Sequence, residues 1–117
     1  FMIRIYEATE PSDLLAEAFA RLLPQLSERM TAPGREAVAR IVASPATRQL
    51  VAAAEDGRIV GLLSVALYDV PSGRKAWIED VVVDAAARGR GIGEALVREA
   101  LALARLECDA QGGPPAL

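Results

Sequence analysis

The sequence predicts one α/β domain in which helices flank a central β-sheet. Its 117 residues, 52% of them hydrophobic, can bury one compact core and are few for two domains. Strand and helix patterns follow one another along the chain in the order strand, helix, helix, three strands, helix. No linker composition divides these elements, so we expect a single domain over residues 2–108 and a loose tail over residues 109–117.

A strand and two helices account for the first part of the chain. Residues 2–7 alternate apolar and polar side chains, as a half-buried strand does. Residues 9–13 contain capping residues and a proline, which together mark a helix start. Pro24 is expected to kink or end this helix, and a second helix starts within residues 31–36 and closes at Ser44. The buried stripe of the first helix is predicted at Leu14, Leu15, Ala18, Phe19, Leu22 and Leu23.

Three strands and a long helix follow. The apolar stretch 49–55 leads into an Asp-Gly pair, a strong hairpin signal, so its partner strand is predicted over residues 58–68. Residues 76–83 form the next strand, and their three consecutive valines suit a buried, central position in the sheet. The last helix is predicted over residues 93–107, and Cys108 follows it.

The composition excludes several kinds of chemistry. The chain has no histidine, which removes serine–histidine and cysteine–histidine catalysis, and its one cysteine cannot form an internal disulfide or a paired-cysteine metal site. We therefore expect no metal. The net charge of −3 gives no case for nucleic acid, and no apolar run approaches the ~20 residues of a membrane span. Because the start of the chain does not read as a secretory signal, a cytoplasmic location is expected.

A loop rich in glycine and arginine separates the last strand from the last helix. Gly89, Gly91 and Gly93 remove side chains where a ligand must approach the backbone closely. The first amides of the following helix have no partner within it and, with the helix dipole, favour an anion. Arg88 and Arg90 add positive charge beside them. These features predict a site for a phosphate or pyrophosphate group.

Two common phosphate-binding motifs do not fit this loop. A P-loop needs a lysine and a serine or threonine after its last glycine, whereas Glu94 and Ala95 follow here. A Rossmann loop follows the first strand of its unit with a different glycine spacing. A nucleotide-binding α/β domain therefore stays a third possibility only, and it would require ATP or NAD to compete with the ligand proposed below.

A third pattern matches. Arg88, Gly91 and Gly93 form Arg-x-x-Gly-x-Gly, which resembles the acyl-coenzyme A signature of the GNAT superfamily of N-acetyltransferases. The preceding strand, Ile78 to Asp84, is also similar to that family and looks especially like glucosamine-phosphate N-acetyltransferases, although this marks the family and not a substrate. The resemblance extends from Met2 to about Glu107. It implies a mixed central sheet flanked by helices, in the order β-α-α-β-β-β-α.

The resemblance implies acetyl-CoA as the acyl donor and assigns the residues that bind it. The strand before the loop would pair its backbone with the pantetheine arm through Val81, Val82 and Val83. The pyrophosphate would lie on the loop and the helix start, at Arg88, Gly89, Arg90, Gly91, Ile92, Gly93, Glu94 and Ala95. The partners expected are therefore acetyl-CoA and an amine acceptor, with no nucleic acid and no membrane.

Two carboxylates precede the valines. An ammonium must lose a proton before its nitrogen can attack a thioester, and a nearby carboxylate can accept that proton directly or through water. A strand amide can hold the developing oxyanion. By position in the family, Glu79 is the favoured base and Asp80 a contact to the amine; the alternative is that either is merely a paired or exposed charge. Tyr6 and Tyr68 do not match the tyrosine with which many family members protonate the leaving thiolate.

The family fold normally continues with a strand, a helix and a hairpin, on the order of 40 residues, that this chain does not contain. An incomplete chain, two copies that cover each other's exposed edge as a homodimer, or a degenerate member would each account for this. The function expected is transfer of acetyl from acetyl-CoA to a primary amine of a small molecule or protein, by direct attack in a ternary complex. The alternative is a non-catalytic acyl-CoA-binding module, possibly active only as an oligomer.

Overall fold

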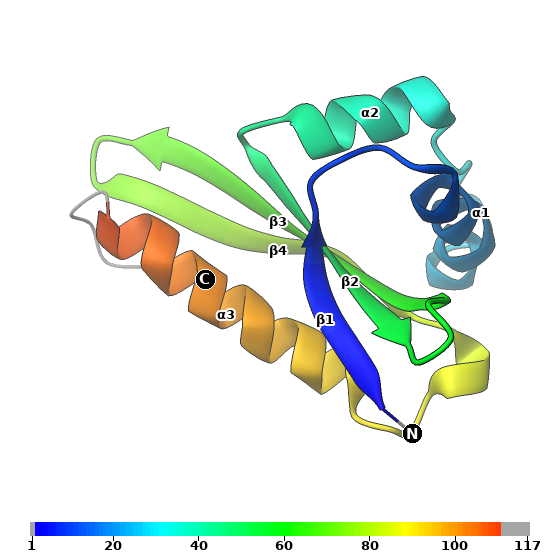
Figure 1. Ribbon diagram of the computed structural model, residues 1–117. Helices are drawn as coiled ribbons and strands as arrows, with labels where there is room; N and C mark the ends of the chain where they lie inside the picture. Colours follow the sequence, from blue (N-terminus) through cyan, green and yellow to red (C-terminus); the bar gives the residue numbers. More distant parts are fainter. Residues whose placement is uncertain (1, 111–117) are drawn as a thin grey trace.

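The computed structural model describes residues 2–110, which form a four-stranded sheet with helices on both faces (Figure 1). The expected order of strands and helices is confirmed, with a short 3-10 helix added before the last helix. The elements are β1 (Ile3–Ala8), α1 (Asp13–Leu26), α2 (Arg35–Ala43), β2 (Thr47–Ala54), β3 (Ile59–Val70), β4 (Gly73–Val83), the 3-10 helix η1 (Ala85–Ala87) and α3 (Ile92–Ala110). The last helix thus passes the expected domain end by two residues, and positions 111–117 of the expected tail lie outside the described residues.

The sheet has the order β1-β2-β3-β4, and each strand is antiparallel to its neighbour. Within the described residues it is therefore antiparallel throughout, where the resemblance implied a mixed sheet. The central position predicted for the valine strand is wrong for this part of the chain, because β4 is an edge strand here. Its valines are still covered, since Val81 and Val83 pack toward α3 while Val82 lies in the core on the opposite face.

Two apolar cores lie on the two faces of the sheet. Helix α3 covers one face, and α1 and α2 cover the other (Figure 1). Ser12 caps α1 by accepting a hydrogen bond from the Leu15 amide at 3.1 Å. The predicted stripe of α1 is buried except for Leu14, which is 47% exposed. Pro24 does not end the helix, because it lies exposed two residues before the end at Leu26 and removes only one hydrogen bond.

Both hairpins of the sheet turn tightly. Gly57 takes a φ of +88° in the predicted Asp-Gly turn, and the Asp56 carboxylate accepts from the Arg58 amide at 2.9 Å. Between β3 and β4 only two residues separate the strands, so the loop expected there is shorter than predicted. Cys108 lies inside α3, fully buried, and does not follow the helix as expected.

A close approach between α3 and the sheet occurs at Gly61, which the sequence analysis did not single out. A Cβ atom there would lie 3.0 Å from Leu96 Cδ1 and 3.2 Å from Ile92 Cγ2. The absence of a side chain on β3 therefore sets how closely the start of α3 packs. At the other end of α3, Glu107 accepts hydrogen bonds from Arg48 at 2.6 Å and from Arg74 at 3.5 Å.

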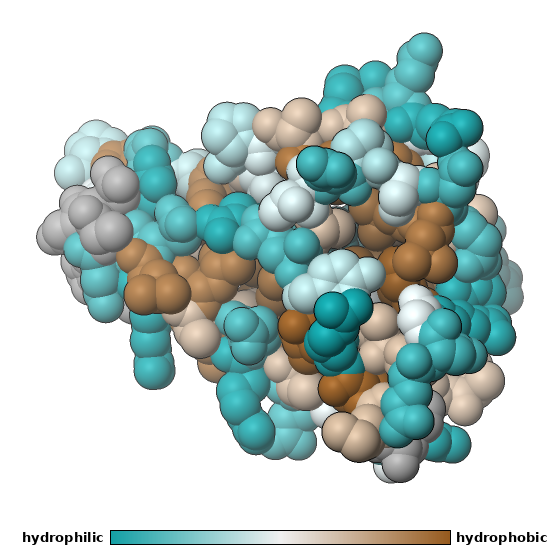
Figure 2. All heavy atoms as spheres, viewed as in Figure 1, coloured by the Kyte–Doolittle hydropathy of each residue, from teal (hydrophilic) through white to brown (hydrophobic). Residues whose placement is uncertain are grey.

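Polar residues cover most of the surface seen in Figure 2, and hydrophobic residues appear between them without a continuous apolar face. No helix among residues 2–110 combines the length and the apolar character that a bilayer crossing requires. The same residues contain no cluster of acidic and cysteine side chains that could hold a metal ion.

Candidate active site

A β-bulge interrupts β4 at the two candidate catalytic carboxylates. Leu62 pairs with Val82 and Ser64 pairs with Glu79, so the single residue Leu63 faces two residues of β4. One of these two is Asp80, whose φ of +49° is the only positive value at a non-glycine position among the described residues. Aspartate tolerates this left-handed backbone better than most residues do. The bulge therefore redirects the Asp80 side chain and breaks the regular alternation of the strand.

The Gly/Arg loop adopts backbone conformations that require glycine. Gly89 and Gly91 have φ values of +83° and +76°, in the left-handed region. The Gly91 carbonyl accepts the first hydrogen bond of α3, from the Ala95 amide at 3.0 Å. The amides of the first turn, from Ile92 onward, therefore have no partner within the helix and point toward the loop. This arrangement suits an anion that approaches along the axis of α3.

Three charged side chains lie in or beside this loop, those of Arg88, Arg90 and Glu94. Arg88 is exposed, and its Nε donates to the Val83 carbonyl at the end of β4 at 3.1 Å. Arg90 is exposed on the same loop. Glu94 lies in the first turn of α3, where a carboxylate could compete with a bound anion. It pairs with Arg98 at 3.0 Å, one turn further along the helix. The loop therefore keeps two exposed arginines near the amides of the helix start.

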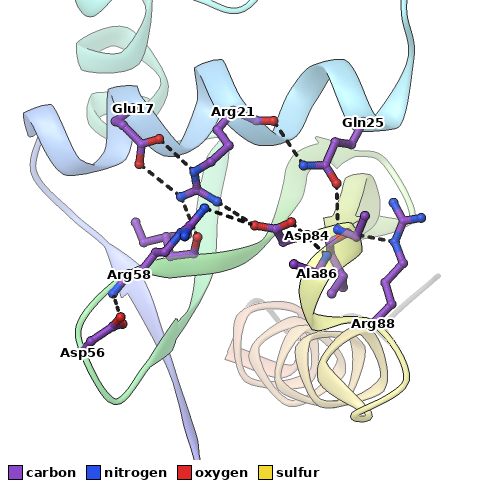
Figure 3. A network of polar contacts seen from close by, with 11 residues as sticks. Glu17, Arg21, Gln25, Asp56, Arg58, Asp84, Ala86 and Arg88 are labelled. Atoms are coloured by element: carbon purple, nitrogen blue, oxygen red, sulfur yellow. Dashed lines mark hydrogen bonds and ion pairs between the residues drawn. The ribbon is translucent and has the colours of Figure 1, made fainter.

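The loop is fastened to α1 by a polar network around Asp84 (Figure 3). The Asp84 carboxylate caps η1 by accepting from the Ala86 amide at 3.1 Å, and it accepts from Arg21 Nη1 at 2.9 Å. Arg21 also donates to the Ile59 carbonyl at 2.8 Å. Gln25, one turn further along α1, accepts from the Ala85 amide at 2.8 Å. One face of α1 thus holds the junction between β4 and the Gly/Arg loop.

The environment of Asp84 favours its charged form. The Ala86 amide holds the pKa of the Asp84 carboxyl below its ordinary value, with further help from Gln25, Arg21 and Arg58, while burial opposes the shift. Arg58 Nη2 lies 3.8 Å from the carboxylate. Asp84 is only 6% exposed, and its ion pair with Arg21 is largely shielded from solvent, so this pair acts as a structural anchor, whereas the Arg58 side chain is exposed.

A cavity of about 180 Å³ opens on the face of the sheet that carries α1 and α2. We call it the helix–sheet cavity. Its apolar lining comes from both helices, from the segment between them and from β3, and three polar side chains from β2, β3 and β4 complete it. The lining residues are Phe19, Leu23, Met30, Thr31, Pro33, Ile41, Gln49, Leu62, Ser64 and Asp80.

The polar side of this cavity is built on a buried glutamine. Gln49 is 3% exposed, and its Nε2 donates to the carbonyls of Leu50 and Leu63, each at 3.2 Å. Its Oε1 accepts from the Ser64 hydroxyl at 2.7 Å. Because two carbonyls face one end of the amide, that end must be the nitrogen. The Gln49 orientation is therefore fixed, and its donors are used.

The structure separates the two predicted catalytic residues. Asp80 lines the helix–sheet cavity, whereas Glu79 does not. Glu79 is nevertheless the direct cross-strand partner of Ser64, so the two side chains share a face of the sheet, the face of the cavity. Both carboxylates are exposed. The bulge thus contributes Asp80 to the cavity, and the Gly/Arg loop follows further along the chain, after the end of β4.

Gln49 and Ser64 were not singled out from the sequence, although a signal existed. Each is a polar residue that adjoins an apolar stretch of its strand, and a buried polar group in such a place needs a partner or a ligand. Trp77, on β4, is 53% exposed and lies outside the core. Tyr68 is 47% exposed and is absent from the cavity lining.

Comparison with known proteins gives a consistent picture. The model of the acetyltransferase (GNAT) family matches residues 5–111. Glucosamine 6-phosphate N-acetyltransferase 1 of Oryza sativa subsp. japonica is 38% identical over 99 residues, which are 78% of this chain and 60% of that protein. The chain therefore spans about 60% of the length of this curated relative.

Solved structures share the fold. An acetyltransferase from Trypanosoma brucei is 26% identical with a TM-score of 0.77, over 99% of this chain and 81% of that chain. Glucosamine-6-phosphate N-acetyltransferase from Arabidopsis thaliana is 23% identical with a TM-score of 0.76, over 100% of this chain and 81% of the other. The second likeness is one of fold alone.

Proposed function

Since this chain belongs to the acetyltransferase (GNAT) family, we propose that it transfers the acetyl group of acetyl-CoA to a primary amine by direct attack in a ternary complex. The single observation that carries the proposal is the conformation of the Gly/Arg loop. Its left-handed glycines and the free first-turn amides of α3 make a cradle into which a pyrophosphate fits. The activity and the substrate of the relative from rice support an acetyltransferase and do not define the acceptor here.

The outer edge of β4 is the proposed place for the pantetheine arm. Among the described residues no strand pairs with this edge, so the outward-facing backbone groups around Val81, Val82 and Val83 are available to an extended ligand, apart from the Val83 carbonyl, which accepts from Arg88 Nε. The proposed pyrophosphate contacts are backbone amides of the Gly/Arg loop and of the first turn of α3, up to Glu94, together with the side chains of Arg88 and Arg90. The β-bulge at Asp80 lies just before these valines and brings the acetyl end of such a ligand close to the two carboxylates.

Acetyl-CoA supplies an activated acyl group: the amine nitrogen bonds to the carbonyl carbon, the carbon–sulfur bond breaks, and an amide and free coenzyme A result. We assign Asp80 to hold the incoming ammonium. Glu79 takes a proton from that ammonium, directly or through one water, so that the nitrogen lone pair becomes available. A backbone amide at the bulge holds the negative charge that develops on the carbonyl oxygen. As the amide forms, the nitrogen gives its second proton to solvent water, and the sulfur leaves as a thiolate that takes a proton from solvent, so that the proton held by Glu79 is the one released overall.

The test is a pair of measurements on the full chain and on Glu79→Gln. Calorimetric titration gives acetyl-CoA affinity, and release of coenzyme A thiol in the presence of an amine panel gives turnover. We expect one acetyl-CoA per chain, unchanged affinity in the variant, and a fall of about 10²-fold or more in kcat. Glu28→Gln, which removes an exposed carboxylate of the same charge, should retain both.

Two results would contradict this assignment in different ways. Binding of acetyl-CoA without turnover on any amine would favour the acyl-CoA-binding module. No binding of acetyl-CoA to a folded chain would remove the loop as a cofactor site and the proposed function with it.

A further inference from the structure

The polar side of the helix–sheet cavity offers hydrogen-bond acceptors. Both donors of the Gln49 amide are used by the Leu50 and Leu63 carbonyls, and the Ser64 proton is used by Gln49 Oε1. What these groups have left is oxygen lone pairs, on Ser64 Oγ and on Gln49 Oε1. The carboxylate of Asp80, the third polar group of this side, is also an acceptor when ionised. A ligand that satisfies this side must bring donors.

An ammonium group matches this arrangement. It carries three N–H donors, no acceptor and a positive charge, so it can meet three oxygens that include a carboxylate. A phosphate or a carboxylate placed in the same position would face lone pairs and the charge of Asp80 without gaining a donor from Gln49 or Ser64. The fixed orientation of the Gln49 amide thus favours a ligand with a positive charge and also sets where the charged group binds.

The remaining lining is apolar and brings no counter-charge for an anion. No lysine or arginine is among the ten lining residues. Thr31 is the only other polar group, and the rest of the walls come from aromatic, aliphatic, thioether and proline side chains. The volume of about 180 Å³ is of the order that accepts a six-membered ring, since a dry cavity of roughly 150 Å³ takes benzene.

We propose that the acceptor of this chain is a small cationic amine with an apolar or uncharged ring-sized body, and that phosphorylated and carboxylated amines are rejected. This inference rests on the proposed function, because it takes the amine bound in the helix–sheet cavity to be the amine that is acetylated. It differs from glucosamine 6-phosphate, for which the curated relative is named and which carries a phosphate. The ammonium lies against Asp80, Ser64 and Gln49, and the body lies between α1 and α2.

Two matched pairs of amines test the proposal. Phenethylamine and phenylalanine share ring and amine, and the second adds a carboxylate; glucosamine and glucosamine 6-phosphate differ by a phosphate. Binding of each is measured by calorimetry with the full chain, alone and with coenzyme A present, and kcat/KM is measured with acetyl-CoA. We expect phenethylamine and glucosamine, which carry no anionic group, to bind and to react at least about tenfold better than phenylalanine and glucosamine 6-phosphate.

Asp80→Asn tests the site within the protein. Asparagine tolerates the left-handed backbone that Asp80 adopts, so the bulge is retained while the charge is lost and a donor is added. Phenethylamine affinity should fall at least about tenfold, with acetyl-CoA affinity unchanged. Glu28→Gln is the matched control, because it removes one carboxylate from the segment that follows α1 without touching the cavity lining.

The outcomes separate this inference from the proposed function. Equal or better binding of phenylalanine or of glucosamine 6-phosphate overturns the inference even if acetyl transfer is observed. Failure of all four amines to bind, with or without coenzyme A, also overturns it. If phenethylamine binds and depends on Asp80 but acetyl-CoA does not bind, the cavity assignment stands and the acetyltransferase proposal falls.

Discussion

The Gly/Arg loop and the helix–sheet cavity have opposite hydrogen-bonding character. The loop offers backbone N–H groups and two exposed arginines, while the cavity offers oxygens from Gln49, Ser64 and Asp80. One region therefore suits an anion and the other a cation. Both involve β4, since its bulge carries Asp80 into the cavity lining and the Gly/Arg loop follows the end of the strand. Under the proposed function, one strand would bring a negatively charged acyl donor and a positively charged acceptor toward the same point.

Helix α1 connects the two regions. Its residues Phe19 and Leu23 line the cavity, and its residues Arg21 and Gln25 hold the start of the loop through Asp84 and Ala85. These two sets lie on different faces of the same helix. A change that loosens α1 should therefore affect both ligands, whereas a change confined to one region should affect one.

Among substitutions outside the two candidate catalytic carboxylates, Gly91→Ala should have the largest effect, a loss of acetyl-CoA affinity, because it distorts the backbone of the Gly/Arg loop alone. The φ of +76° at this position costs an alanine about 1–2 kcal/mol and shifts the amides that follow. Acetyl-CoA affinity measured by calorimetry should fall at least about tenfold, while phenethylamine affinity stays the same. Gly34→Ala is the control, since φ at Gly34 is −76° and nothing lies within 4 Å of the added Cβ. Equal effects of the two substitutions would contradict a special role for the loop backbone.

Gly61→Ala should have the next largest effect, a loss of stability, because it displaces α3, the helix whose first turn belongs to the proposed anion site. The added Cβ would meet Leu96, Ile92 and Ala52 at 3.0 to 3.3 Å, so α3 must shift or the core must strain. We expect a loss of about 1–3 kcal/mol in urea unfolding. In Gly93→Ala the added Cβ lies 3.6 Å from Val83 Cγ2, an ordinary contact, so stability should hold or rise. A stable Gly61→Ala would show that the packing of α3 is looser than described.

Asp84→Asn should lower the free energy of unfolding by a smaller amount. Because Asp84 ties α1 to the start of the Gly/Arg loop, the substitution should loosen both the loop and the helix that lines the cavity. The variant keeps a side-chain oxygen for the Ala86 amide but loses the charge that pairs with Arg21, at a cost of about 1–2 kcal/mol. Because the folded-state pKa of Asp84 is lowered, its contribution is present above the unfolded value of about 4 and is lost as pH falls through the folded value. Urea unfolding of both proteins between pH 3 and pH 7 should therefore give a difference that is constant near neutrality and shrinks below about pH 4. A difference that grows on acidification would contradict this role.

How much the sequence predicted depended on how local each feature is. The position of the Gly/Arg loop was predicted to within one residue at the start of α3, because glycine spacing and a helix start are local signals, and Gly89 and Gly91 do adopt left-handed conformations. The helix–sheet cavity was not predicted, because its lining comes from elements far apart in the chain. Aspartate at position 80 in a valine-rich strand was a signal of the bulge, since aspartate disfavours regular strands.

The errors share a cause, which is that tertiary surroundings override local patterns. Three valines suggested a central strand, yet β4 is an edge strand in the described chain. Helices on both faces cover these valines, Val82 fully and Val81 and Val83 in part, without a strand on the outer edge. Leu14 follows the helical period but lies at the margin of the stripe and stays exposed. Pro24 near an exposed helix end did not break α1.

In the proposed function, the backbone of the Gly/Arg loop binds the anionic end of acetyl-CoA, and the helix–sheet cavity does not. The most direct measurement is a ¹H–¹⁵N correlation spectrum of the full chain during titration with acetyl-CoA. We expect saturable shifts at one equivalent per chain for the amides of Gly89, Gly91 and Gly93 and along β4 near Val82, with the Gln49 side-chain amide unaffected. Shifts centred on Gln49 and the cavity, with the three glycine amides unmoved, would contradict the account.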